Sequence, residues 1–136
     1  MASTKQLYRH FKENHQHPVC WACGRDESQR PDGWYGPFVV ERAHLVSSPR
    51  AEDVRLIVLL DTICHKVSGG ERIFINGQLW PLPKLTLPQL LTLKELFDPE
   101  HYDRAFMQRF SAKRLPEPEP IPDCYIAAYR ARRHGV

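Results

Sequence analysis

The stretch that decides the fold begins with the sequence CWACG at residues 20–24 and ends with DTICH at residues 61–65. Two thiols separated by two residues and followed by glycine can wrap one soft divalent metal, because the intervening backbone folds into a tight knuckle. A third thiol, Cys64, follows later in the chain with His65 directly beside it. These residues predict a metal-binding knuckle completed by a distant part of the chain.

The segment between these thiols predicts a strand, a loop, a second strand and the start of a helix. The sequence FVVERA at residues 38–43 is rich in β-branched and aromatic residues, which predicts a strand with His44 at its end. The apolar run at residues 54–60 predicts a buried second strand, with a helix as the alternative. A short helix from Asp61 or Thr62 should follow and end before the Ser-Gly-Gly sequence at residues 68–70.

Three pieces of this stretch together resemble the HNH endonuclease family: ERAHL at residues 41–45, the apolar run at 57–60, and CHK at 64–66. Members carry a zinc-binding Cys-x-x-Cys pair on each side of an Ala-His or Asp-His dipeptide, an Asn before the second pair, and a His directly after the last Cys. The resemblance covers residues 18–70. It implies a small ββα-metal core with a zinc knuckle.

The resemblance also implies a set of zinc ligands. Cys20, Cys23 and Cys64 match family cysteines, and Asp61 stands where the family has the remaining one. Three thiolates and one carboxylate satisfy tetrahedral zinc, although less tightly than four thiolates. Cys124 is a rival fourth ligand, with a small core residue as its alternative role. The alternative for the whole site is that no zinc binds and Cys64 is simply buried.

By the same resemblance, His44 is the general base, Glu41 holds or polarises its imidazole, and His65 ligates a catalytic Mg²⁺ or Mn²⁺ ion. Hydrolysis of a DNA phosphodiester requires a water that loses its proton near neutral pH, which an imidazole can accept. The divalent ion would stabilise the charge that develops on the phosphate and the leaving oxygen. The implied function is metal-dependent cleavage of DNA.

Two more positions depart from the family pattern. Ala43 stands directly before the predicted base, where many members place a metal-binding Asp or His. Leu56 falls on the middle Asn of the family, and a leucine can neither bind metal nor brace a loop through hydrogen bonds. Asp53 and Asp61 are the candidate substitutes. These departures keep open a second function, a catalytically inactive zinc-stabilised module that binds nucleic acid or another partner.

The chain of 136 residues predicts a single α+β domain, long enough to bury a core of its own. The HNH-like core at residues 18–70 is followed by a hairpin and a helical extension at residues 71–136. A further helix is expected at residues 3–14, because Ser3 can cap it and two apolar residues fall on one face.

The extension carries its own local signals. Asn-Gly at residues 76–77 predicts a type I′ hairpin. A capping box at residues 86–89 predicts a helix that ends at Phe97. The next helix should begin at Asp98-Pro99 and pack a stripe against the core, with an apolar residue every four positions. That stripe consists of Tyr102, Phe106 and Phe110.

Proline at every second position of residues 116–122 predicts an extended strap over residues 115–122. Asp123 can cap a last helix that runs to Arg133.

Composition indicates where the protein works. No apolar run approaches the roughly 18 residues of a membrane span, and residues 1–6 lack the apolar core of a signal peptide. We therefore expect a cytoplasmic protein without a membrane segment. In a reducing compartment the cysteine pair at positions 20 and 23 indicates metal binding or thiol redox chemistry. The redox alternative would require a βαβ context, which the sequence around Cys20 does not show.

The formal net charge of +3 and a pI near 8.7 are compatible with nucleic-acid binding. Positive charge gathers near the carboxyl end, where Arg130, Arg132 and Arg133 are expected to contact DNA phosphates. The alternative is an ordinary solvated helix face.

Overall fold

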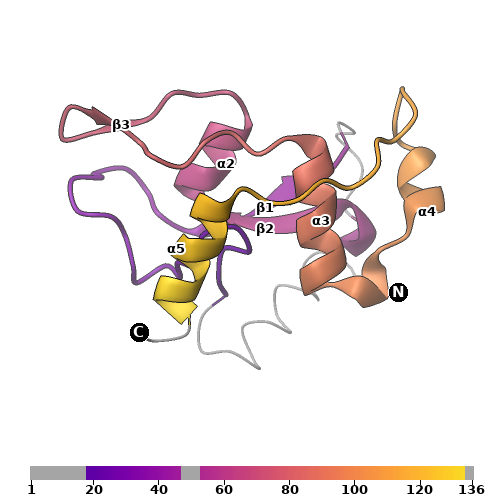
Figure 1. The fold of residues 1–136 in the computed structure, drawn as a ribbon, viewed down its shortest axis with the longest axis horizontal. Coiled ribbons are helices and arrows are strands. Elements are labelled where there is room, and N and C mark those ends of the chain that lie inside the picture. Colours follow the sequence, from indigo (N-terminus) through magenta and orange to yellow (C-terminus); the bar gives the residue numbers. More distant parts are fainter. Residues whose placement is uncertain (1–17, 47–52, 134–136) are drawn as a thin grey trace.

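A two-stranded hairpin lies at the centre of the computed structural model, which describes residues 18–46 and 53–133 (Figure 1). β1 (Val40–His44) and β2 (Ile57–Asp61) pair antiparallel, so that the first residue of β1 lies opposite the last residue of β2. Alternating and apolar β-branched residues favour this pairing. The predicted helix at residues 3–14 lies outside the described residues.

β2 runs directly into α2 (Thr62–Ser68). All five residues of β2 are buried, because the strand contacts β1, α2 and α3 (Leu87–Phe97). Asp61 ends the strand and caps the helix, and its Oδ1 accepts a hydrogen bond from the backbone of Cys64 at 2.8 Å. The predicted order of two strands followed by a helix is therefore confirmed, while most of the predicted loop lies in residues 47–52, outside the described residues.

The predicted second strand begins later than expected. Val54–Leu56 form a 3-10 turn, η1, and only Ile57 onward is strand. The side chain of Asp53 explains the difference, since its Oδ1 accepts a hydrogen bond from the backbone of Arg55 at 2.9 Å and closes a turn. β1 likewise begins at Val40 rather than at residue 38.

The expected hairpin follows α2. β3 (Phe74–Ile75) and β4 (Gln78–Leu79) are joined by Asn76 and Gly77, which have φ values of 53° and 77°. Two consecutive positive φ values are what a type I′ turn requires, so the Asn-Gly prediction is confirmed.

α3 (Leu87–Phe97) starts with the predicted capping box at Thr86 and Gln89. The proline-rich strap lies against α3. The carbonyl of Glu119 accepts a hydrogen bond from the hydroxyl of Thr92 at 2.6 Å, and its backbone N–H donates to the carbonyl of Pro88 at 3.1 Å. The strap thus carries the chain back across the core toward the knuckle.

The prediction of a helix that begins at Asp98-Pro99 is wrong. Pro99–His101 form a 3-10 turn, η2, and a separate short helix, α4 (Arg104–Gln108), follows. Asp103 rather than Asp98 caps α4 with its side chain, which accepts a hydrogen bond from the backbone of Phe106 at 3.0 Å. Of the expected stripe, Tyr102 and Phe106 pack against the main apolar cluster, whereas Phe110 lies 39% exposed at the surface.

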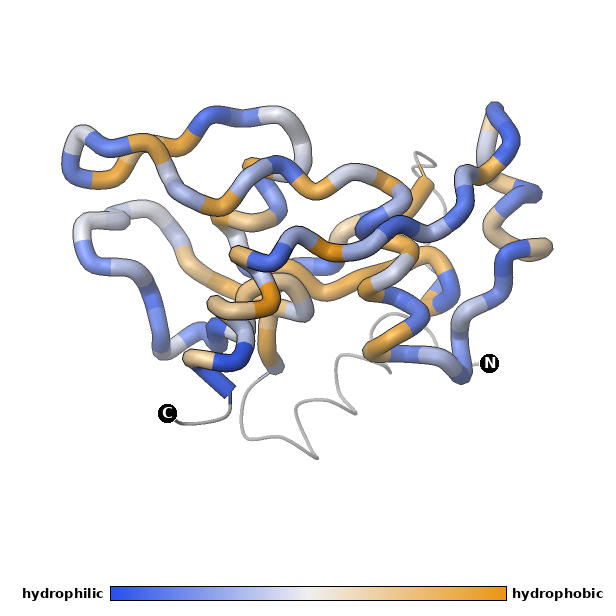
Figure 2. The backbone as a smooth tube through the Cα atoms, viewed as in Figure 1, coloured by the Kyte–Doolittle hydropathy of each residue, from blue (hydrophilic) through white to orange (hydrophobic). Residues whose placement is uncertain are grey.

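The last helix, α5 (Asp123–Arg133), spans the predicted residues, but Asp123 is its first residue rather than its cap, and the carbonyl of Pro122 accepts the first hydrogen bonds. This helix returns to the knuckle, beside the central hairpin (Figure 1). The apolar segments of the chain gather around β2, whereas much of the loop between the knuckle and β1 is hydrophilic (Figure 2). The result is a small α+β fold. Among the residues that the structure describes, none of the helices has the length and apolar character needed to cross a membrane.

Candidate metal centre

The CWACG stretch forms a tight knuckle beside β2. The carbonyl of Cys20 accepts a hydrogen bond from the backbone of Gly24 at 2.9 Å, and Gly24 has a φ of 78°. A side chain at that φ would be strained, so glycine is the residue that suits this turn. The backbone N–H of Trp21 donates to the carbonyl of Leu59 at 2.9 Å and fixes the knuckle to β2.

Four candidate ligands converge at this point. Cys20 and Cys23 come from the knuckle, Asp61 from the end of β2, and Cys64 from the first turn of α2. Their ligand atoms lie within 4.8 Å of one another, and all four residues are buried. The sequence predicted this set, and the structure brings all four members together.

Asp61 has two separate roles. Its Oδ1 caps α2, while its Oδ2 accepts a hydrogen bond from the thiol of Cys23, with 2.8 Å between oxygen and sulfur. One carboxylate oxygen therefore faces the thiols, while the other caps the amino end of α2.

Electrostatics show why this cluster suits a cation. Burial raises the pKa of Cys20, and hydrogen bonds with Cys20 and Cys23 raise the pKa of Cys64. Burial, and next the charge of Cys23, raise the pKa of Asp61 to about 7. Hydrogen bonds from Cys20 and Cys64 lower the pKa of Cys23, so that it takes up the negative charge that the other groups resist. All four groups can ionise together only around a cation.

The donor set fits zinc. Three sulfur atoms and one carboxylate oxygen, close enough to surround one ion, match the tetrahedral coordination and the ligand preference of Zn²⁺. A structural zinc bound here would tie the knuckle to β2 and α2. Cys124, the rival ligand, lies exposed on α5 and is outside this cluster, so both roles predicted for it are wrong.

A second polar pair lies on the outer side of α2. Nδ1 of His65 is 2.9 Å from Oε1 of Glu41, and the two side chains are 41% and 36% exposed. The carboxylate orients the imidazole and leaves its Nε2 for another partner, such as a metal ion or a proton. Glu41 was expected to hold His44, so its bond with His65 is a different pairing.

His44 is exposed at the last position of β1, opposite Ile57. Successive side chains of a strand point to opposite faces, which places Glu41 and His44 on opposite faces of β1. Ala43, between them in the sequence pattern, is buried. Leu56 is fully buried in the main apolar cluster, so this position serves the core.

Comparison with protein-family models, curated proteins and solved structures finds no match.

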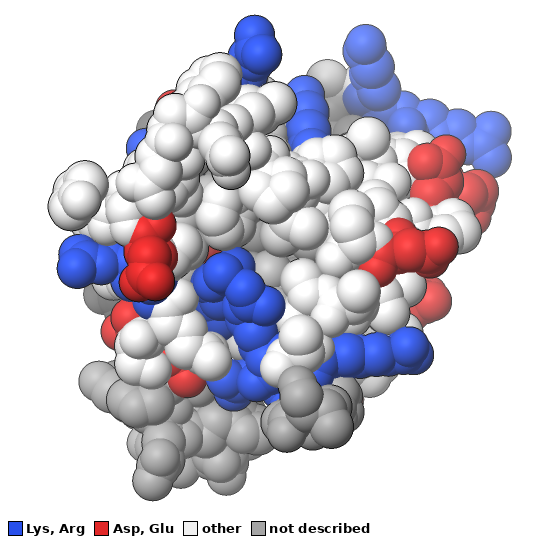
Figure 3. All heavy atoms as spheres, turned by 60° about the vertical axis from the view of Figure 1, so that its left-hand side comes forward, with Lys and Arg blue, Asp and Glu red and all other residues white. Residues whose placement is uncertain are grey.

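The three arginines predicted to bind DNA differ in their surroundings. Nη2 of Arg133 donates to the side chain of Gln29 at 2.9 Å and lies 3.5 Å from a carboxylate oxygen of Asp26. Arg132 is half-buried, and Arg130 is exposed. On the face shown in Figure 3, basic side chains form separate groups with acidic ones between them. Arg130 is therefore the best placed of the three for a phosphate.

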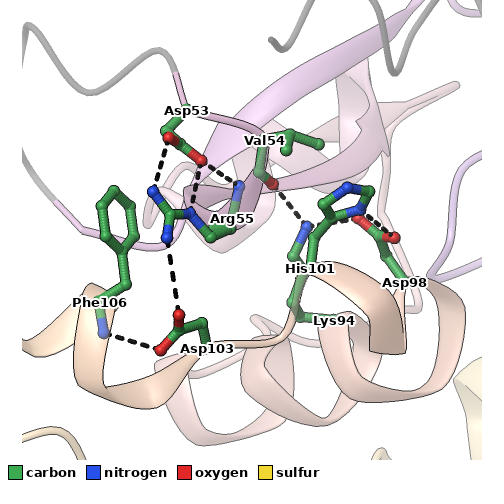
Figure 4. Close-up of polar contacts among 8 residues, drawn as sticks. All are labelled: Asp53, Val54, Arg55, Lys94, Asp98, His101, Asp103 and Phe106. Carbon is green, nitrogen blue, oxygen red and sulfur yellow. Dashed lines mark hydrogen bonds and ion pairs between the residues drawn. The ribbon is translucent and has the colours of Figure 1, made fainter. Parts of the chain in front are cut away.

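Sequence reasoning missed a buried lysine. Lys94 of α3 is fully buried, and its Nζ donates to the carbonyl of Val54 at 2.6 Å and to Oδ2 of Asp98 at 2.8 Å (Figure 4). Burial lowers the pKa of Lys94. Oδ1 of Asp98 contacts Nδ1 of His101 at 2.7 Å. The spacing of Lys94 and Asp98, four residues apart, was the available signal.

Proposed function

We propose that this protein is a zinc-stabilised, HNH-like endonuclease that hydrolyses phosphodiester bonds of DNA. The observation that supports it best is the position of His65. Its neighbour Cys64 belongs to the buried thiol cluster, while His65 itself is half-exposed and held by Glu41 at 2.9 Å. A zinc-braced helix would thus present an oriented imidazole at the surface.

The chemistry proposed for this site requires a second divalent ion. Nε2 of His65 is the ligand available to Mg²⁺ or Mn²⁺. The carboxylate of Glu41, bonded to Nδ1 of the same ring, would make that nitrogen a stronger metal ligand. The ion, when bound, would stabilise negative charge on the phosphate. His44 remains the proposed general base, which would accept a proton from the attacking water.

Nicking of supercoiled DNA tests the proposal. With Mg²⁺ or Mn²⁺ present, the His44→Ala and His65→Ala variants should each lose roughly 10²-fold or more in nicking rate. Zinc content and melting temperature should stay near those of the wild type, so that lost activity reports on chemistry rather than on unfolding.

His101→Ala is the matched control, because His101 is also hydrogen-bonded to a carboxylate but lies in the other polar centre. It should retain nicking activity. If the wild type binds zinc and nicks no DNA with Mg²⁺, Mn²⁺, Co²⁺ or Ni²⁺, the nuclease proposal is wrong.

A second candidate function is a catalytically inactive zinc-stabilised module that binds nucleic acid or another partner. Two observations favour it: Glu41 and His44 lie on opposite faces of β1, and Leu56 is fully buried where the family has its Asn. Such a module would retard DNA in a gel without cutting it. The redox alternative has less support, since Cys20 and Cys23 are both fully buried and a redox thiolate requires access.

A further inference from the structure

α5 lies directly against the knuckle. A Cβ atom added at Gly24 would come within 3.1 Å of side-chain atoms of Tyr129 and Arg133, and within 3.2 Å of the Cα of Tyr129. Contacts this short would force α5 or the knuckle to shift by a few tenths of an ångström if a side chain were added. The backbone of the knuckle and the backbone of α5 are therefore packed in contact.

The inner face of α5 joins the core that contains the thiols. Tyr125 is fully buried in the same apolar cluster as Cys20, Cys23 and Cys64, and its hydroxyl donates to the carbonyl of Pro83 at 2.5 Å. Ala128 packs on this cluster one helical turn later. α5 therefore packs over the knuckle and over the part of the core that holds the thiols.

A metal bound in this centre would leave a buried negative charge. Zn²⁺ contributes two positive charges, while three thiolates and one carboxylate contribute four negative ones, so the filled centre carries a net charge of −2. Buried charge is costly unless an opposite charge lies close by. The centre therefore requires cationic neighbours.

One arginine lies on the face of α5 that packs on the core, and a second follows the knuckle directly in the chain. Arg132 is half-buried and follows Ala128 by four residues and Tyr129 by three, which places it on the face of α5 that covers the knuckle. Arg25 continues from the knuckle, and its backbone N–H donates to the sulfur of Cys23. Its guanidinium lies 5.2 Å from the centre of the Trp80 ring.

The electrostatics of Arg132 agree with this geometry. Burial lowers its pKa, and so does the neighbouring positive charge of Arg25, whereas the negative charges of Cys23, Asp61 and Cys64 raise it. The guanidinium of Arg132, whose Nη1 donates to the carbonyl of Ala128 at 3.4 Å, is close enough to interact with both the acidic cluster and the charge of Arg25. That arrangement is favourable when the cluster is ionised, which is its metal-bound state.

We propose that Arg132 and Arg25 are the counter-charge of the metal centre, and that they allow this Cys₃Asp site to hold its zinc as a buried dianion. The inference rests on the zinc site of the proposed function. It assigns Arg132 a role in metal retention, which differs from the DNA contact expected of it from the sequence.

Zinc affinity of the full-length chain, measured by competition with a chromophoric chelator, tests the assignment. Arg132→Gln and Arg25→Gln should each weaken zinc binding by about 10-fold, the lower end of the effect of losing a group that supports metal ligands. Arg130→Gln is the matched control, because it removes the same charge from the exposed face of the same helix. Arg132→Lys should restore most of the affinity.

A double substitution tests the charge argument itself. Asp61→Asn keeps an oxygen that can cap α2 but reduces the charge of the filled centre from −2 to −1. If Arg132 acts as a counter-charge, Arg132→Gln should weaken zinc binding less in the Asp61→Asn background than in the wild type. Equal effects in the two backgrounds would show that Arg132 acts only through packing.

The outcomes separate this inference from the proposed function. If the wild type binds no zinc, the assignment of the zinc site is wrong, and the counter-charge role of the arginines is wrong as well. If the wild type binds zinc and Arg132→Gln matches Arg130→Gln, the counter-charge is overturned while the zinc site stands. Weaker DNA binding by Arg132→Gln with unchanged zinc affinity would also overturn it. Should Arg132→Gln fail to fold, the zinc affinities of Arg25→Gln and Arg130→Gln are compared instead, and equal affinities would overturn the counter-charge.

Discussion

Two buried polar centres flank β2, and they are built on opposite plans. The cluster of Cys20, Cys23, Asp61 and Cys64 contains only acidic groups, all buried and within 4.8 Å of one another. The centre around Lys94 contains both signs of charge and is satisfied by the chain itself.

The Lys94 centre extends to the surface through a second set of pairs (Figure 4). Arg55 forms two hydrogen bonds with the carboxylate of Asp53, at 3.0 and 3.1 Å, and lies 3.6 Å from a carboxylate oxygen of Asp103. Its guanidinium also lies 3.2 Å from the centre of the Phe106 ring. These contacts join η1 to α4, so this centre serves to clamp the helical extension onto the hairpin.

The difference teaches how to distinguish a binding site from a structural network. A polar network that neutralises itself needs nothing from outside and stabilises one packing arrangement. A cluster of acidic groups has a charge that no residue within it can offset, so it predicts a cation. A chelator should therefore destabilise the fold through the thiol cluster alone, whereas a substitution in either centre should lower the free energy of unfolding.

The largest effect is expected at the thiol cluster. Cys20→Ser should release the zinc and lower the melting temperature strongly, because structural zinc sites contribute roughly 10 to 16 kcal/mol of binding free energy that is coupled to folding. Metal stoichiometry and thermal denaturation measure both results. A chelator should reproduce the effect in the wild type and add nothing to the variant. If the wild type carries no metal and Cys20→Ser leaves the melting temperature unchanged, the knuckle is a simple turn and not a metal site.

The next largest effect is expected at Lys94. Lys94→Ala should cost about 3 to 5 kcal/mol in the free energy of unfolding, because it leaves the buried carboxylate of Asp98 without its cation. Denaturant titration gives this value, and zinc stoichiometry should remain unchanged. Lys94→Met is the matched control for lost volume. If either substitution removed the zinc, the two centres would not be independent.

A smaller, pH-dependent effect is expected at Asp53. Hydrogen bonds from Arg55 lower the pKa of Asp53 below its ordinary 3.8. A lowered pKa in the folded state means that the pair stabilises the protein fully above pH 3.8 and loses this contribution as the pH falls through the folded value. The stability difference between the wild type and Asp53→Asn should therefore shrink only in that acid range. A difference that shrinks between pH 7 and 5 would assign it to another group.

The smallest effect is expected at an exposed ion pair between the strap and α4. Glu117 lies 3.7 Å from a guanidinium nitrogen of Arg104, and its side chain is 83% exposed. Glu117→Gln should change the free energy of unfolding by less than about 0.5 kcal/mol, since solvent screens exposed ion pairs. Denaturant titration in low and high salt checks it. A larger loss would mean that the strap depends on this pair.

Local chemistry explains which parts of the fold the sequence predicts. The knuckle, the Asn-Gly turn and the capping box at Thr86 each depend on a few neighbouring residues, and all three occur as expected. The ligand set is expected from the cysteine pair together with the family resemblance, which points to Asp61 and Cys64. Those two residues lie three positions apart at the start of a helix, whereas the knuckle reaches them only through long-range contacts.

Contacts between distant residues explain what the sequence does not predict. Asp98 seemed free to cap a helix, but its carboxylate binds Lys94 and His101, and the helix begins later, at Arg104, with Asp103 as its cap. Glu41 bonds with His65 because β1 lies beside α2, a relation that no spacing along the chain reveals. The turn at the start of the apolar run has a local cause instead, since the side chain of Asp53 accepts a hydrogen bond from the backbone of Arg55.

The cover that α5 places on the thiol cluster has a consequence for the order of synthesis. Every candidate ligand lies at or before Cys64, whereas α5 begins at Asp123 and the strap must be made first. Chains emerge from the ribosome amino end first, so the knuckle, the hairpin and α2 exist while the cover is still unmade. Zinc can enter an open centre during that interval. Once α5 is in place, metal exchange requires its displacement, so the mature protein should exchange zinc slowly.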